Sequence, residues 1–251
     1  MTSSGSSGRG PAHGFPWLVL IVGTAALAAL LALGTWQMHR LAWKEALIAT
    51  IDQRIVSAPR PLADIERLYA TSGDVDYWPV SLRGTFLHGQ ENHFLATWRG
   101  ASGYFVYTPL ELADGRLVFV NRGFVPFDRK DSSTRPEGQV EGEVEIVGLA
   151  RNPLAAKPSW IVPDNDLVKN VFYWKDIAAM ASRSGIERAR LIPFFVDAGP
   201  GDHPGTLPEG GVTIIDLPNN HLQYAITWYG LAAALLVVLV VFIRGRLRPR
   251  P

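Results

Sequence analysis

The stretch from Leu217 to Ile243 contains no formally charged side chain, and it constrains the fold more than any other feature of the chain. A helix needs about 20 residues to cross the hydrocarbon core of a bilayer. We therefore predict a membrane-spanning helix over residues 218–243. Its first turns carry His221, Tyr224 and Trp228, which fall at i, i+3 and i+7 and so share one helix face. Such a face could hold a flat ligand where the hydrocarbon begins.

A second uncharged stretch lies near the N-terminus, between Arg9 and Arg40. Its centre, Pro16 to Leu33, is almost wholly Leu, Ala, Val and Ile, and we predict a first span over residues 15–36 with Trp17 and Trp36 as interfacial anchors. The alternative is a cleaved signal peptide, for which the Ala-rich triplets could serve as cleavage sites. The hydrophobic core of a signal peptide usually ends sooner than this one, so we favour the span.

The flanking charges predict the orientation of the spans. The C-terminal tail, residues 244–251, carries four arginines and no acid, whereas residues 191–243 contain no Lys or Arg. Basic flanks stay in the cytoplasm, so we place this tail there, and with it the Ser- and Gly-rich N-terminal tail, residues 1–14. The segment between the spans, residues 37–217, then lies on the outer face. Arg40 and Lys44, which follow the first span, argue weakly for the opposite orientation.

The middle segment reads as an α+β domain rich in antiparallel β-sheet, with a few helices. The first span continues as helix over residues 36–56, and short helices are predicted over 61–70 and 174–184. Period-two runs rich in Val, Phe, Tyr and Thr predict strands. These runs are residues 77–87, 92–98, 104–111, 116–125, 143–149, 193–197 and 212–217. Asp114-Gly115 is the best hairpin signal, and the charged residues 128–142 predict a mobile excursion.

Composition excludes several kinds of chemistry. The chain has no cysteine, so disulfides, thiolate metal sites and cysteine nucleophiles are excluded, and its net charge of +1 gives no footprint for nucleic acid. Phosphate-binding and nucleophile motifs are absent, and we expect no enzyme activity. His88 and His93 with Glu91 could form a metal site, but solvated turn residues are the favoured interpretation.

Small residues in both spans predict close helix packing, on each other or on a partner subunit. Gly230 and Ala234 are spaced by four in the second span, and Ala25–Ala29 and Ala28–Ala32 repeat this spacing in the first. In lipid, small residues allow helix backbones to approach each other.

Three motifs, in this order, carry a resemblance to a known family. Gly34-Thr35-Trp36-Gln37 closes the first span, Val120-Asn121-Arg122-Gly123-Phe124-Val125-Pro126 lies at the centre, and Pro218 to Tyr229 opens the second span. Together with the stretch Asn170 to Asp176, they resemble the Surfeit locus 1 family of cytochrome c oxidase assembly factors. The match runs from about Trp36 to Ile243.

The resemblance implies a membrane protein of the bacterial type that helps to mature subunit 1 of a terminal haem-copper oxidase. It implies binding of haem a through the histidine at the second span, here His221, and a bacterial inner-membrane location with a periplasmic domain. Expected partners are oxidase subunit 1, haem a synthase and membrane lipid. The alternatives are a scaffold that holds an oxidase subunit without touching haem, and, least favoured, a membrane-anchored enzyme.

The residues themselves suggest how such a site could work. His221 would ligate the haem iron, since the positive end of the helix dipole keeps its imidazole neutral. Tyr224 and Trp228 would give the porphyrin apolar contact, and Asn220 could orient the ring or contact a propionate. The alternatives are that His221 is simply an interfacial residue, or that His39, at the mouth of the first span, is the ligand.

Arg122 is a second-tier candidate for haem propionates or the oxidase subunit. The alternative is that Arg122 pairs with a carboxylate of its own domain while Gly123 serves a bulge or a close backbone approach.

Overall fold

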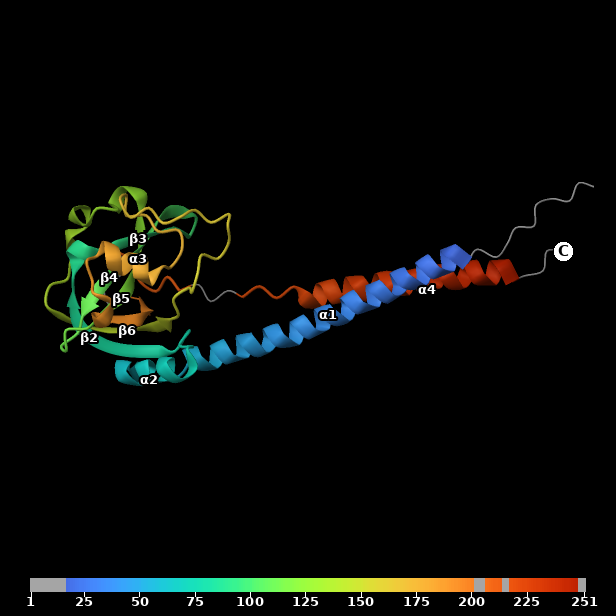
Figure 1. Cartoon of the computed structure of the whole chain (residues 1–251), viewed down its shortest axis with the longest axis horizontal. Helices are drawn as coiled ribbons and strands as arrows, with labels where there is room; N and C mark the ends of the chain where they lie inside the picture. Colours follow the sequence, from blue (N-terminus) through green and yellow to red (C-terminus); the bar gives the residue numbers. More distant parts are fainter. Residues whose placement is uncertain (1–16, 201–205, 214–216, 248–251) are drawn as a thin grey trace, which may run out of the picture. The chain divides into compact units, whose positions relative to one another are not determined.

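The structure, a computed structural model, describes residues 17–200, 206–213 and 217–247 (Figure 1). Its backbone divides into a helical unit, residues 1–48 and 217–251, and a domain, residues 49–216. The predicted N-terminal tail and the end of the C-terminal tail lie outside the described residues, as do residues 214–216 of the last predicted strand. The described residues 212, 213 and 217 are not in a strand.

The helical unit consists of most of α1 (Trp17–Ile55) and all of α4 (His221–Leu247), which run antiparallel. Both helices are long and apolar enough to cross a membrane, and the most apolar part of each is largely exposed, unlike a core helix of a soluble protein. The architecture of two apolar helices flanking a sheet-rich domain is therefore confirmed. The point along each helix where a bilayer would begin stays a prediction.

The two helices meet along a seam in which the less exposed positions alternate in steps of three and four. These positions are Gly23, Leu27, Leu30, Gly34, Gln37 and Leu41 in α1, and His221, Ala225, Trp228, Ala232, Leu235 and Leu239 in α4. This is the heptad spacing of left-handed helix pairs. A methyl group added at Gly34 would lie 2.7 Å from the Tyr229 ring, so glycine permits the contact there.

The two spans pack on each other, which confirms one of the two predicted arrangements, but the predicted small-residue pair of the second span lies outside this contact. Packing of that pair on a partner subunit stays a prediction. Gly230 and Ala234 are exposed, and a methyl group added at Gly230 would meet no described atom within 4 Å. The close approaches lie instead at Gly34 and at Gly23, which faces Leu239. A spacing of four alone does not say which face of a helix meets its neighbour.

The domain is built on a sheet that closes on itself. The described strands are β1 (Arg60–Pro61), β2 (Pro79–Phe86), β3 (Asn92–Trp98), β4 (Ala101–Glu111), β5 (Leu117–Pro126), β6 (Glu143–Arg151) and β7 (Leu191–Ala198). They pair in the order β1-β2-β6-β7-β5-β4-β3, and a further pairing of β2 with β4 closes a barrel. Most pairs are antiparallel as predicted, while β1–β2 and β5–β7 are parallel.

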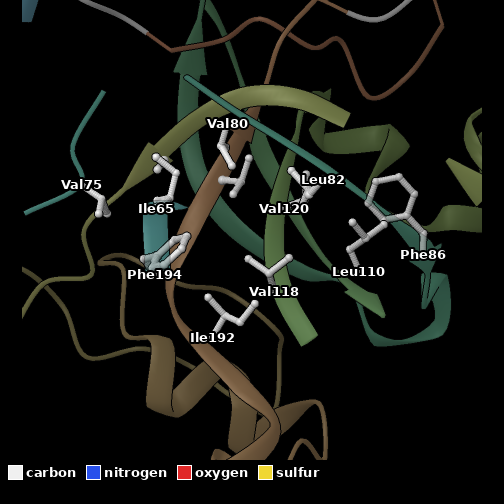
Figure 2. Close-up of a cluster of buried hydrophobic side chains, with 12 residues drawn as sticks. Ile65, Val75, Val80, Leu82, Phe86, Leu110, Val118, Val120, Ile192 and Phe194 are labelled. Carbon is white, nitrogen blue, oxygen red and sulfur yellow. The ribbon is translucent and has the colours of Figure 1, made fainter. Parts of the chain in front are cut away.

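The barrel encloses an apolar core, seen in Figure 2, to which every one of its five closing strands contributes. Its members include Val80, Leu110, Val118, Ala150 and Phe194, and helix α2 (Leu62–Ser72) adds Ile65. A second cluster, formed by Tyr107, Phe119, Phe172, Met180, Ala181 and Phe195, packs helix α3 (Ile177–Arg183) against the sheet. The tight β4–β5 hairpin has Gly115 at φ 78°, which confirms the Asp-Gly turn.

The prediction of a mobile excursion over residues 128–142 is corrected by the structure. The segment forms short 3-10 turns, η2 (Phe127–Arg129), η3 (Ser132–Thr134) and η4 (Pro136–Gly138). Arg135 inside it is fully buried and ion-paired with Glu91. A buried ion pair holds a segment that its charge and its Pro and Gly content had marked as exposed.

Candidate functional site

The mouth of α4 places His221 in the seam with α1. Its Nδ1 lies 2.8 Å from Oε1 of Gln37, and Gln37 is only 8% exposed. An amide oxygen accepts hydrogen bonds and does not donate them, so in the neutral imidazole of His221 this contact puts the proton on Nδ1. Nε2 is then the nitrogen with a free lone pair. Histidine ligands are usually fixed by this kind of hydrogen bond through the other ring nitrogen.

The remaining residues predicted at this mouth occupy different positions around the helix. Trp228 is half-buried on the same stripe as His221, two turns further on, whereas Tyr224 is 55% exposed on the outer side. Asn220 is exposed just before the helix begins, and its carbonyl oxygen accepts a hydrogen bond from the Tyr224 amide at 3.2 Å. The three side chains therefore surround the start of α4 without lining an enclosed pocket.

The sequence interpretation missed two polar groups near this mouth. Thr35 Oγ1 donates to the Leu31 carbonyl at 2.9 Å and lies 3.1 Å from the Tyr229 hydroxyl, which joins α1 to α4. Asn219 Oδ1 is buried and has no hydrogen-bond partner among the described residues. It is thus an unused polar atom two residues before His221. Gln37 and Thr35 stood within the motif that closes the first span, but only the helix pairing shows which of them meets His221.

His39, the rival ligand, does not join His221. It is exposed and lies two residues from Gln37, so it projects from a different face of α1 than the seam. Within the described part of the helical unit, the structure brings a single imidazole into the seam.

Arg122 lies in the domain, and its side chain is only 9% exposed. Its guanidinium is 3.5 Å from Oε1 of Glu91 and 3.2 Å from Nδ1 of His88, and it also donates to the Gly138 carbonyl. Burial lowers the pKa of Arg122 to about 10, although Glu91 opposes this shift. The pairing with a carboxylate of its own domain is therefore observed, and a contact with haem stays a prediction.

Glu91 is the centre of this buried cluster. Both of its carboxylate oxygens accept from Arg135, at 3.2 Å to Oε1 and at close range to Oε2. His93 is 7% exposed, so the interpretation of His93 as a solvated turn residue is wrong. Burial, together with the charges of Lys130, Arg135 and Arg183, lowers the pKa of His93 to about 3. Among the described residues, no group of three or more His, Asp or Glu side chains is arranged to hold a metal ion.

The domain also contains a polar hub that sequence reasoning did not single out. Asp197, only 4% exposed, accepts a hydrogen bond from Asn121 Nδ2 at 3.0 Å and another from Thr213 Oγ1 at 3.0 Å. Arg151 Nη1 lies 3.7 Å from the same carboxylate. A lone Asp at the end of an apolar strand was the only signal in the sequence that could have pointed to this hub.

Comparison with known proteins identifies the family. The SURF1 family model matches residues 24–233. Surfeit locus protein 1 of Xenopus tropicalis is 38% identical over 239 residues, which cover 87% of this chain and 72% of that protein. The human protein of the same name is 37% identical, with 87% and 74% covered, and the SURF1-like protein of Drosophila melanogaster is 32% identical, with 87% and 74% covered. The family model matches from within α1, through the whole domain, to within α4, and the chain therefore belongs to the SURF1 family.

Proposed function

We propose that this chain is an assembly factor for cytochrome c oxidase that binds haem a through His221 and assists its insertion into subunit 1. The observation that carries the proposal is the hydrogen bond from His221 Nδ1 to Gln37 Oε1 at 2.8 Å. In the neutral imidazole this contact leaves the Nε2 lone pair free, as an iron ligand requires. Membership of the SURF1 family supports the oxidase role through what is known of that family.

The residues at the mouth of α4 fit a porphyrin in chemical type. Gln37 would hold the imidazole in one orientation, and Trp228 and the exposed Tyr224 would supply apolar contact. Asn220 and the unpartnered Asn219 Oδ1 would offer polar groups toward the propionate edge, which a protonated propionate or a bridging water could use. The bound haem would be cargo for the oxidase. One imidazole in the seam suits release, because a single protein ligand must be exchanged.

The proposal places the two helices in a bacterial inner membrane. Arg244 and Arg246 end α4 and hold its C-terminus in the cytoplasm, so the domain lies in the periplasm. The domain would then face oxidase subunit 1 and haem a synthase from that side. External protease on spheroplasts should cut inside residues 153–168 and spare the C-terminus, and the reverse pattern would invert the topology.

A scaffold that holds an oxidase subunit without haem is the second candidate. One loop of the domain favours it, because Trp160, Ile161 and Val168 are 88%, 72% and 98% exposed. Large apolar side chains that stay exposed within one segment are typical of interaction sites. Neither candidate involves a catalytic reaction by this chain.

One preparation separates the two candidates. The full chain is purified from cells that make haem a, and its absorption spectrum is recorded alongside its co-purification with subunit 1. A Soret band that scales with the amount of protein supports the haem carrier. Co-purification of subunit 1 without haem supports the scaffold and overturns haem binding.

A further inference from the structure

The C-terminal end of α1 and the linker that leads into α4 both contact one polar network inside the domain. On one side, Arg54 in the last turn of α1 lies 2.9 Å from Oδ2 of Asp74 and donates to the Asp76 carbonyl at 2.9 Å. Arg151 Nε in turn donates to Asp76 Oδ1 at 3.2 Å. The far end of α1 is therefore connected to the end of β6.

On the other side, the network reaches the linker, residues 206–213. Arg151 Nη1 is 3.7 Å from Asp197 Oδ2, and the same oxygen accepts the Thr213 hydroxyl at 3.0 Å. Thr213 precedes His221 by eight residues. A series of polar contacts thus runs from Arg54 through Arg151 and Asp197 to the linker.

The sequence motif Val120 to Pro126, in β5, contacts this linker. Asn121 donates to Asp197 Oδ1 at 3.0 Å and accepts the Gly123 amide at 3.1 Å. Gly123 has φ 126°, and a methyl group there would lie 1.9 Å from the Glu209 carbonyl oxygen. Next to this close approach, the backbones of Phe124 and Glu209 form two hydrogen bonds of 2.9 Å with each other. The glycine is needed because the linker lies directly on β5.

Electrostatic interactions between the charged residues stabilise this network. Burial alone would lower the pKa of Arg151, but Asp197 and Asp76 outweigh that effect and raise it. Burial would likewise lower the pKa of Lys175, and Tyr107 and Asp197 raise it. The charge of Asp197 therefore favours the charged forms of two cations, Arg151 and Lys175.

We propose that Asp197 and Arg151 are positioning residues. Together they form a clamp that holds the C-terminal end of α1, at Arg54, to the linker that leads into α4. The clamp fixes how the two ends of the domain are held relative to each other.

The absence of cysteine allows the clamp to be tested with spin labels. Cysteines replace the exposed Gln53, in the last part of α1, and the exposed Gln223, in the first turn of α4, and the distance distribution between the labels is measured in the full chain in nanodiscs. Arg54→Gln cuts one arm of the clamp and Thr213→Val the other. Arg67→Gln and Thr71→Val are matched controls on α2, because the hydrogen bonds that these two side chains make with described residues stay within that helix.

The clamp predicts that each cutting variant broadens the distribution and that the controls do not. Because the contacts act in series, the double variant should broaden it little more than either single one. The thermal unfolding midpoint of the domain is followed in parallel, and Asp197→Asn is added as a variant at the hub. Unchanged distributions in both cutting variants, or equal broadening in the controls, would overturn the proposal.

Haem content is measured on the same samples, so that the two proposals fail separately. A protein without haem whose distribution broadens on cutting refutes the proposed function and keeps the clamp. A haem-loaded protein whose distance distribution never changes supports the proposed function and refutes the clamp.

Discussion

The helical unit and the domain each bury a polar cluster, and the two clusters differ in what they leave free. In the domain, Arg135 donates to both carboxylate oxygens of Glu91, and the carbonyls of Arg129 and Lys130 accept two further hydrogen bonds from Arg135. In the helix seam, Gln37 satisfies one nitrogen of His221 and leaves the other available. A closed cluster stabilises a fold, whereas a cluster with a free lone pair is ready to bind a ligand.

The largest expected effect concerns the closed cluster. Arg135→Met leaves Glu91 buried with weaker compensation, and breaking a buried ion pair costs about 3–5 kcal/mol of unfolding free energy. Urea unfolding of the domain, followed by tryptophan fluorescence, measures it. Arg99→Gln is the control, since the Arg99–Glu209 pair is exposed and worth about 1 kcal/mol or less.

The double variant Arg135→Met/Glu91→Leu sharpens this prediction. With both charges removed, the loss should be smaller than in Arg135→Met alone, because no uncompensated carboxylate remains. A double variant less stable than the single one would show that packing around Arg135, and not its charge, holds the segment.

A larger side chain should disturb the packing of α1 on α4 at Gly34 but not at Gly230. Gly34→Leu drives a side chain into the Tyr229 ring and should separate α1 from α4 at the mouth, with loss of most bound haem. Gly230→Leu is the matched control, since a side chain there meets no described atom and haem content should stay near wild type. Equal losses in the two variants would contradict the seam described here.

The smallest effect is the pH dependence contributed by His93. Its pKa is near 6.5 in the unfolded chain and about 3 in the folded domain, so below pH 6.5 the unfolded chain binds the extra proton. Stability attributable to this group is therefore full above pH 6.5 and falls as pH drops toward 3. Between pH 7 and 5 the loss amounts to about 2 kcal/mol.

His93→Gln removes the titrating group and tests this assignment. The pH dependence of the urea midpoint between pH 7 and 5 should flatten relative to wild type. A variant that keeps the full wild-type slope would move the pH dependence to another residue.

Local patterns in the sequence predicted most of the fold. Alternation placed β3 at Asn92–Trp98 without error, Asp114-Gly115 marked the β4–β5 hairpin, and Pro59 ended the helix that continues the first span. The parallel β5–β7 pairing was missed because pairing partners distant in sequence leave no local signal. Arg135 was missed because a charged run looks the same whether one of its members is buried or none is.

The candidate site was predicted only in part, for a related reason. Helical spacing grouped His221 with Tyr224 and Trp228, but the residue that fixes the imidazole, Gln37, comes from the other helix. Gly123 was predicted to serve a bulge or a close backbone approach, and it serves both, because the β4–β5 register shifts at this point and the Glu209 carbonyl lies against it. The identity of the approaching segment required the folded chain. Contacts of this kind, between segments far apart in the sequence, could not be predicted from one sequence alone.

The measurement that tests the central claim most directly is haem content per protein in four versions of the full chain, purified alike from cells that make haem a. These are wild type, His221→Ala, Gln37→Ala and His39→Ala. We predict that His221→Ala loses its haem, that Gln37→Ala keeps a reduced amount with a shifted Soret band, and that His39→Ala matches wild type. Equal haem in wild type and His221→Ala, or a loss confined to His39→Ala, would contradict the account.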